Sequence, residues 1–179
     1  MTKGHLLGLY QTKLNHITLT YASMVLWSYP DTPRVYKELY AEIMPKLPNR
    51  PDVLIDAQPL IGDDVALRIA TEELFDSAHR AAIKELFPLT KVYCHATSQL
   101  HLMKAQPWFE FWRIIRNCWS HDMTFNFNLH ERSVLPITWS GVTLDVAMNG
   151  KPLTHGQCSR EKLRQLLERA RDFVRDDLA

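Results

Sequence analysis

Apolar residues recur every three or four positions along most of this chain, and this spacing constrains the fold more than any other feature. Between positions 5 and 28 the pattern consists of Leu6, Tyr10, Leu14, Ile17, Tyr21, Met24 and Val25. Such spacing places apolar side chains on one face of an α-helix. The sequence therefore predicts a long amphipathic helix at the beginning of the chain.

Proline and capping residues divide the following region into further helices. Thr32 is expected to cap a helix that has Pro33 in its first turn and runs to about Met44. A proline-rich loop is expected at 46–62, with a short extended piece at 53–55.

The pattern then predicts three more helices. One begins at Asp63 and Asp64 and ends before Pro88, and another covers 89–104. Gln106 and Pro107 open a third helix, which is expected to end near Asp122.

Between 123 and 153 the spacing changes. Apolar and polar residues alternate over 123–130, which predicts an extended segment. Short strand-like runs over about 134–153 are separated by Ser140-Gly141 and Asn149-Gly150, both hairpin-turn signals. A small antiparallel β meander is therefore expected. Ser159 then caps a last helix, whose apolar stripe consists of Leu163, Leu166, Leu167, Ala170, Phe173, Val174 and Leu178.

Composition places the chain among single-domain globular proteins. With 179 residues, 46% of them hydrophobic and 23% charged, it is long enough for one core, and we expect one domain over 1–179. No run of about 18 apolar residues could span a bilayer, and the N-terminal residues do not resemble a secretory signal. No membrane association and a cytoplasmic location are therefore expected.

The charge and cysteine content also restrict the function. Cys94, Cys118 and Cys158 are far apart and form no Cys-x-x-Cys, so reduced thiols are expected rather than disulfides or a zinc site. The net charge of +1 provides no general attraction for nucleic acid. Any contact with RNA would have to come from a local cluster.

Such a cluster lies at the end of the helix predicted after Pro107, in the string Arg116-Asn117-Cys118-Trp119-Ser120-His121. On a helical wheel one arc is polar and comprises Glu110, Arg113, Arg116, Asn117, Ser120 and His121. The opposite side is apolar and comprises Trp108, Phe111, Trp112, Ile114, Ile115, Cys118 and Trp119. The apolar side is expected to hold this helix in the core.

The polar arc suits acid/base chemistry on a phosphodiester. Arginine presents a planar fork of donors to phosphate, histidine exchanges a proton near neutral pH, and an asparagine amide can orient either group. We take Arg116, Asn117 and His121 as candidate catalytic residues and Arg113 and Ser120 as candidate substrate-binding residues. The alternative is an ordinary solvated helix face.

Other kinds of site have less support. The eight histidines include no His-x-x-x-His, so neither a metal nor a cofactor is expected. No glycine-rich phosphate loop and no glycine-flanked serine occurs, and Cys118 falls on the apolar face. The basic residues of the last helix alternate with acidic ones, which is typical of a solvated face. His79 and His101 could join the site from neighbouring helices.

The Arg116-Asn117 and His121 string resembles the signature of the HEPN superfamily (higher eukaryotes and prokaryotes nucleotide-binding), in which an arginine and a polar residue precede a histidine. The resemblance implies a mainly α, up-and-down helical bundle, with the meander inserted before the last helix. It also implies a homodimer in which two motifs face each other.

Many members of this superfamily are metal-independent endoribonucleases, often toxins or antiviral defence effectors. By that resemblance His121 would be the general base or acid, Arg116 would stabilise charge on the phosphorane, and Asn117 would position either the phosphate or the histidine. RNA and an antitoxin or another protein would be partners. Other members have lost activity, so a non-catalytic dimerisation or protein-binding module is the alternative.

Overall fold

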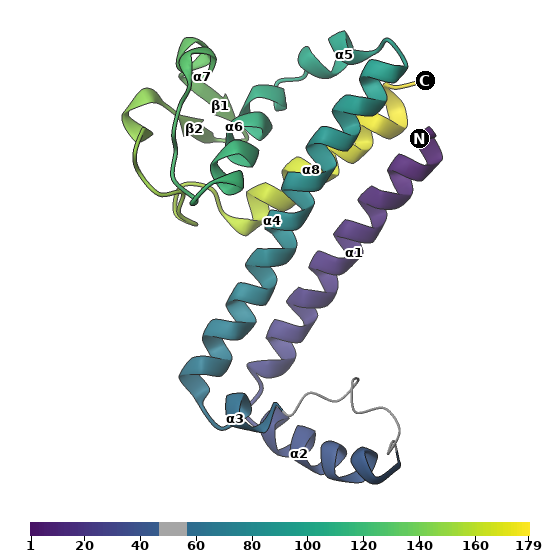
Figure 1. Ribbon diagram of the computed structural model, residues 1–179, viewed down its shortest axis with the longest axis vertical. Helices are drawn as coiled ribbons and strands as arrows, with labels where there is room; N and C mark the ends of the chain where they lie inside the picture. The colour runs from purple at the N-terminus through teal and green to yellow at the C-terminus, as the bar shows by residue number, and fades with distance from the viewer. Residues whose placement is uncertain (47–56) are drawn as a thin grey trace. The chain divides into compact units, whose positions relative to one another are not determined.

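The computed structural model describes residues 1–46 and 57–179, and it is mainly α, as predicted (Figure 1). Its α-helices are α1 Lys3–Trp27, α2 Thr32–Ile43, α3 Gln58–Ile61, α4 Asp64–Ala96, α5 Leu100–Lys104, α6 Phe109–Ser120, α7 Leu129–Val134 and α8 Arg160–Asp176. Two antiparallel strands, β1 Ile137–Trp139 and β2 Val142–Leu144, precede the last helix. Short 3-10 helices occupy Met44–Lys46 and Val146–Met148. Within the described residues, no helix has both the length and the apolar character that crossing a membrane requires.

The contacts of the chain divide between two compact units. Unit one comprises Met1–His16 and Ala78–Ala179, and unit two comprises Ile17–Ser77. Both α1 and α4 contribute residues to each unit. The expectation of one domain over 1–179 stays a prediction.

The core of unit one forms around the tryptophan-bearing face of α6. Trp108 and Trp112 are fully buried, and Trp112 donates a hydrogen bond from Nε1 to the carbonyl oxygen of Ile83 at 3.2 Å. The ring of Trp108 lies edge-on to that of Phe173 of α8, with centroids 5.5 Å apart. Every residue of the apolar stripe predicted for α8 is buried. The apolar faces predicted for both helices are confirmed.

The N-terminal part of α1 belongs to the same core. Its Tyr10 is fully buried and shares a 2.8 Å hydrogen bond with the hydroxyl of Thr90 in α4. Lys13 forms an ion pair of 2.6 Å with Glu85. The predicted first helix is thus confirmed, and in unit one its apolar stripe packs as expected.

The prediction that Pro88 ends a helix was wrong, because α4 continues through it to Ala96. Proline lacks the N–H that would bond to the carbonyl oxygen of Lys84, but it can remain in a helix where packing outweighs that loss. Leu86, Phe87 and Thr90, which flank Pro88, are buried in the core. The predicted helix over 89–104 is instead the end of α4, a break with Ser98 at φ 58°, and the short α5.

The segment that precedes the sheet also differs from the prediction. Around Phe125 the chain is not helical, as expected, and the N–H of Phe125 donates to the carbonyl oxygen of Lys151 at 2.9 Å. The prediction of an extended segment was wrong after Asn128, because residues 129–134 form α7. Asn128 and Glu131 make a capping box, a local interaction that favours a helix start over a strand.

The meander is smaller than predicted. Only β1 and β2 pair as strands, with Thr138 opposite Thr143, and the hairpin turn has Ser140 at φ 49° and Gly141 at φ 79°. Positive φ at both central residues is the mark of the type I′ turn that suits a hairpin. The last part of the expected meander, around Pro152, does not join this sheet, because Pro152 forms an isolated bridge with Thr124.

Unit two contains the end of α1, α2, α3 and the beginning of α4. The predicted cap of α2 was displaced by one residue: Asp31 is the N-cap, while the Thr32 hydroxyl donates to the carbonyl oxygen of Leu26 at 2.5 Å. The helix α3 lies in the predicted loop, and the extended piece expected at 53–55 falls outside the described residues. The rings of Tyr21 and Phe75 connect α1 to α4, with centroids 5.7 Å apart.

Candidate functional site

The polar arc of α6 is the place that the sequence predicts for chemistry, and the structure separates its residues into two groups. The helix ends at Ser120, since His121 has the non-helical angles φ −106° and ψ −132°. Arg113, Arg116, Asn117 and Ser120 are therefore helical and half-buried, whereas His121 is exposed beyond the helix end. The apolar face opposite is buried throughout and fixes the orientation of the arc.

A buried carboxylate organises the helical part of the arc. Glu131 of α7 is 2% exposed, and its Oε1 accepts a 2.7 Å hydrogen bond from Nδ2 of Asn117. The amide oxygen of Asn117 in turn accepts from Nη1 of Arg116 at 3.1 Å. Both ends of the Asn117 amide are thereby occupied. The three side chains form a continuous chain that sets the amide orientation of Asn117.

The same carboxylate is held in place by its own helix start. Its Oε2 accepts from the backbone N–H of Asn128 at 3.0 Å, and the N–H of Glu131 donates to Oδ1 of Asn128 at 2.9 Å. Our sequence reasoning missed Glu131. The sequence contains its signal, because Asn128-Leu129-His130-Glu131 has the spacing of a capping box, but the alternation of apolar residues over 123–130 predicts an extended segment.

Arg113, a candidate substrate-binding residue, is occupied by acidic partners. Its Nε donates to Oε2 of Glu110 at 2.6 Å, and its Nη1 lies 3.5 Å from Oε1 of Glu131. Ser120, the other candidate, donates its hydroxyl to the carbonyl oxygen of Arg116 at 2.8 Å. Both side chains therefore make contacts that stabilise the helix and its neighbours.

Arg116 differs from Arg113 in its electrostatic surroundings. Among the described residues, 1–46 and 57–179, the one hydrogen bond that the structure gives for its guanidinium is to the neutral amide of Asn117. Its Nε is buried and lacks a hydrogen-bond partner within the same described residues. No carboxylate is paired with this guanidinium there, so its charge remains available to an anion.

His121 borders a surface hollow of about 510 Å³. The hollow is lined by His121, Asp122, Thr124, Phe125, Asn126, Asn149 and Gly150. A much smaller cavity of about 10 Å³ is lined by both Asn117 and His121, together with Glu131. The structure thus brings Asn117 and His121 together, while Arg116 lines neither space.

The turn that forms the far wall of the hollow follows from its sequence. Asn149 has φ −57° and ψ 131°, Gly150 has φ 76°, and the N–H of Lys151 donates to the carbonyl oxygen of Met148 at 2.9 Å. These angles define a type II turn, in which glycine is preferred at the second central position. The Oδ1 of Asn149 accepts from the N–H of Phe127 at 2.9 Å. This bond connects the turn to the segment that follows His121.

The cysteines have surroundings unsuited to nucleophilic chemistry. Cys94, Cys118 and Cys158 are free and buried. Burial raises the pKa of the Cys118 thiol to about 12, so its thiolate is rare at neutral pH. Among the described residues, no group of three or more His, Cys, Asp or Glu has the arrangement to hold a metal ion.

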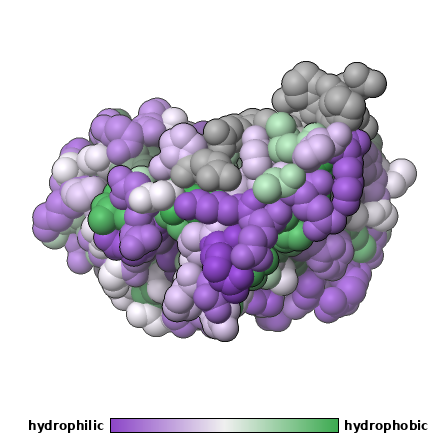
Figure 2. All heavy atoms as spheres, turned by 90° about the horizontal axis from the view of Figure 1, so that it is seen from below, coloured by the Kyte–Doolittle hydropathy of each residue, from purple (hydrophilic) through white to green (hydrophobic). Residues whose placement is uncertain are grey.

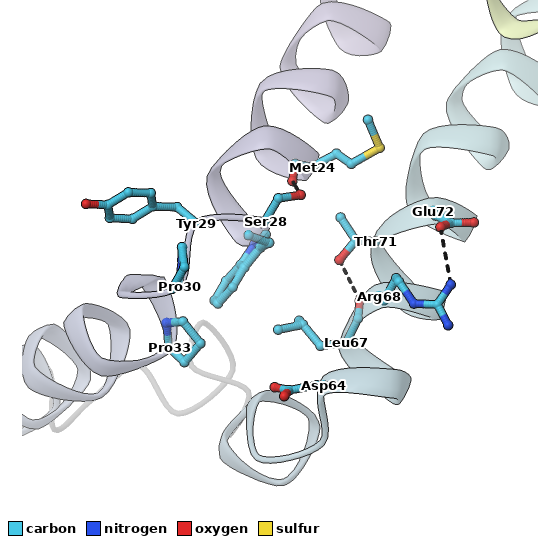
Figure 3. A pocket seen from close by; sticks show the side chains of 11 residues that line it. Met24, Ser28, Tyr29, Pro30, Pro33, Asp64, Leu67, Arg68, Thr71 and Glu72 are labelled. Atoms are coloured by element: carbon cyan, nitrogen blue, oxygen red, sulfur yellow. Dashed lines mark hydrogen bonds and ion pairs between the residues drawn. The ribbon is translucent and has the colours of Figure 1, made fainter.

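A second cleft, of about 560 Å³, lies within unit two (Figure 3). Met24, Ser28 and Tyr29 line one side, and Leu67, Arg68 and Thr71 of α4 line the other. Its serine and threonine hydroxyl groups are bonded to the adjacent helices: Thr71 donates to the carbonyl oxygen of Leu67 at 2.6 Å, and Ser28 to that of Met24 at 2.8 Å. Nη1 of Arg68, another residue of the cleft, lies 3.9 Å from Oε1 of Glu72.

Comparisons were made with protein-family models, with curated proteins and with solved structures, and none of the three found a match. The indications of function are therefore the geometry of the α6 site and the resemblance of its motif.

Proposed function

We propose that this protein is a metal-independent endoribonuclease of the HEPN type, with His121 as the proton-transfer group. The observation that carries this proposal is the position of His121, which is exposed at a hollow of about 510 Å³ and shares a smaller cavity with Asn117. A single-stranded RNA segment could enter such an open hollow. Arg116, the arginine of the motif, lies five residues before His121, near the end of α6.

The reaction would be an internal transesterification. The RNA 2′-oxygen forms a bond to the adjacent phosphorus while the bond between phosphorus and the 5′-oxygen breaks. A base accepts the 2′-hydroxyl proton, and an acid protonates the departing 5′-oxygen. The products are a 2′,3′-cyclic phosphate and a 5′-hydroxyl, and DNA lacks the attacking group.

Each motif residue has a distinct part in this scheme. Neutral His121 accepts the 2′-hydroxyl proton, and Arg116 supplies positive charge to the phosphorane oxygens. Asn117, held by Glu131 at 2.7 Å, keeps Arg116 at a defined position through their 3.1 Å hydrogen bond. A single histidine cannot be both base and acid in one step, so a homodimer would provide a second His121 as the acid. RNA and an antitoxin or other inhibitory protein are the corresponding partners, in a toxin-antitoxin or phage-defence context.

The test is cleavage of single-stranded RNA by the purified protein in EDTA. We expect a cyclic phosphate product, no cleavage of the matched 2′-deoxy strand, and a loss of roughly 100-fold or more in rate for His121→Ala, the usual contribution of a general acid or base. His95→Ala, which removes another exposed histidine, is the matched control and should retain the rate. Absence of cleavage, or equal rates for the two variants, would contradict the proposal.

A non-catalytic interaction module is the second candidate, and two observations favour it. The amide of Asn117 and the guanidinium of Arg113 already have partners in Glu131. In addition, unit two exposes large apolar side chains, among them Leu19, Leu39 and Ile69, each at least half exposed. An inactive protein that still forms a defined complex would fit this candidate.

A further inference from the structure

The hollow beside His121 has a lining that suits the base of a nucleotide better than its phosphate. Among the lining residues that the structure describes, Asp122 is the only aspartate, glutamate, lysine or arginine. A carboxylate repels a phosphate group, so the hollow favours a neutral, polar ligand group. Its volume of about 510 Å³ falls within the usual range of small-molecule sites.

Two polar side chains of the hollow are held by hydrogen bonds to the backbone. Oδ1 of Asp122 accepts from the N–H of Thr124 at 3.1 Å, and Oδ1 of Asn149 accepts from the N–H of Phe127 at 2.9 Å. Within the part of the chain that the structure describes, Oδ2 of Asp122 and Nδ2 of Asn149 have no hydrogen-bond partner. The hollow therefore offers a ligand one acceptor group and one donor group that are oriented before the ligand binds.

The polarity of the surface does not by itself single out this hollow. Tyr21 and Val25 of α1, which the spacing predicts to lie in the core, are each 53% exposed. The face drawn in Figure 2 is mostly hydrophilic, with apolar residues in separate small patches. The hollow is distinguished instead by Asp122 and Asn149, each bonded to the backbone at one end and open to a ligand at the other.

We infer that this hollow is a subsite for a guanine base. The Watson–Crick edge of guanine presents two neighbouring donors, N1–H and the 2-amino group, followed by one acceptor, O6. A carboxylate can accept from both donors, since Oδ1 of Asp122 retains a second lone pair beside its bond to Thr124. The NH2 group of Asn149 can donate to O6. Both fixed groups of the hollow are then paired.

The other bases match these two groups less well. Uracil presents a carbonyl oxygen on each side of its single N3–H, so one of these oxygens would face the carboxylate. Adenine and cytosine each present one amino group beside a ring nitrogen acceptor, so the carboxylate of Asp122 would accept from one donor instead of two. The expected order of affinity is guanine first, adenine and cytosine next, and uracil last.

The position of the base relative to the cleaved bond rests on the proposed function. In that scheme His121, which lines the same hollow, accepts the 2′-hydroxyl proton. A base in the hollow therefore belongs to the nucleotide whose ribose attacks, and the phosphate is left to Arg116. The protein would then cleave RNA on the 3′ side of guanosine. The preference for guanine can be measured by binding, without cleavage.

Nuclear magnetic resonance titration of the full chain with guanosine, inosine and uridine 3′-monophosphates tests the inference. The three probes share the ribose and the phosphate and differ only in the base, and inosine lacks only the 2-amino group of guanosine. We expect guanosine 3′-monophosphate to bind roughly tenfold more tightly than the inosine compound, with the uridine compound weakest.

Two conservative variants change the atoms that face the ligand and keep the bonds to the backbone. Asp122→Asn retains an Oδ1 for the N–H of Thr124 but removes the charge, and Asn149→Asp retains an Oδ1 for the N–H of Phe127 but replaces the donor with an acceptor. Each should reduce the ratio of guanosine to uridine affinity by roughly tenfold. Asp177→Asn, which changes an exposed acid at the end of α8, is the matched control and should keep the ratio of the parent protein.

The outcomes separate this inference from the proposed function. Equal affinities for the three nucleotides, no binding of any of them below roughly 10 mM, or a guanosine preference that survives both variants would overturn the base subsite, even where RNA is cleaved. A guanosine preference that both variants remove, in a protein that cleaves no RNA in EDTA, would support the subsite and contradict the ribonuclease.

Discussion

Replacing Glu131 is expected to destabilise unit one more than replacing any exposed acid of the chain. Its carboxylate is 2% exposed and accepts from Asn117 and from the N–H of Asn128, at 2.7 and 3.0 Å, with Nη1 of Arg113 at 3.5 Å. Glu131→Ala leaves these donors without an acceptor in a buried place. Breaking a buried charged pair in this way costs about 3 to 5 kcal/mol.

The measurement is urea denaturation followed by circular dichroism, with thermal unfolding beside it. For a chain of this size, about 3 kcal/mol corresponds to a fall in Tm of roughly 6 to 12 °C. Glu131→Gln keeps the volume but presents an NH2 group to one of the donors, so it should lose less, about 1 to 3 kcal/mol.

Glu72→Ala is the matched control, because Glu72 forms an exposed ion pair with Arg68 at 3.9 Å. Exposed pairs of this kind contribute at most about 1 kcal/mol. A loss below about 1 kcal/mol for Glu131→Ala, equal to that of the control, would refute the role assigned to this carboxylate.

Two further predictions concern stability. Gly8→Ala should stabilise the protein by about 0.5 to 1 kcal/mol in urea denaturation, since Gly8 is helical and an added Cβ meets nothing within 4 Å; a destabilised variant would show that the space is needed. Burial raises the thiol pKa of Cys94 to about 11, and those of Cys118 and Cys158 to about 12. Because the unfolded thiols ionise at lower pH, the stability that these buried thiols contribute is complete below about pH 9 and is lost as the pH rises toward 11 to 12. Cys118→Ala should make the unfolding free energy less dependent on pH above 9, and an unchanged slope would contradict this.

The elements that could be predicted are those whose signals are local and agree with one another. Ser159 caps α8 through a hydrogen bond from the N–H of Lys162, and the α8 stripe is buried as its spacing predicts. On α6 the tryptophan face and the polar arc follow from the helical period alone. The Ser140-Gly141 turn likewise specifies its hairpin, because few residues accept two consecutive positive φ angles.

The errors arose where two local signals competed. Pro88 is a helix breaker by itself, but Leu86, Phe87 and Thr90 are buried around it and the helix continues. Alternation over 123–130 competed with the Asn128 and Glu131 capping box, and the box prevailed because it satisfies backbone donors at the start of α7.

The sequence by itself determined a mainly α fold, the faces of α6 and α8, and the clustering of Arg116, Asn117 and His121 near one helix end, since periodicity and capping act over a few residues. Only the tertiary structure decided which of those side chains are bonded within the protein and which can contact a ligand. Glu131 lies 14 residues beyond Asn117 in sequence yet bonds to it at 2.7 Å, while His121 leaves the helix and reaches the surface. Long-range packing of α7 on α6 makes that distinction, because burial and partner choice depend on residues distant along the chain.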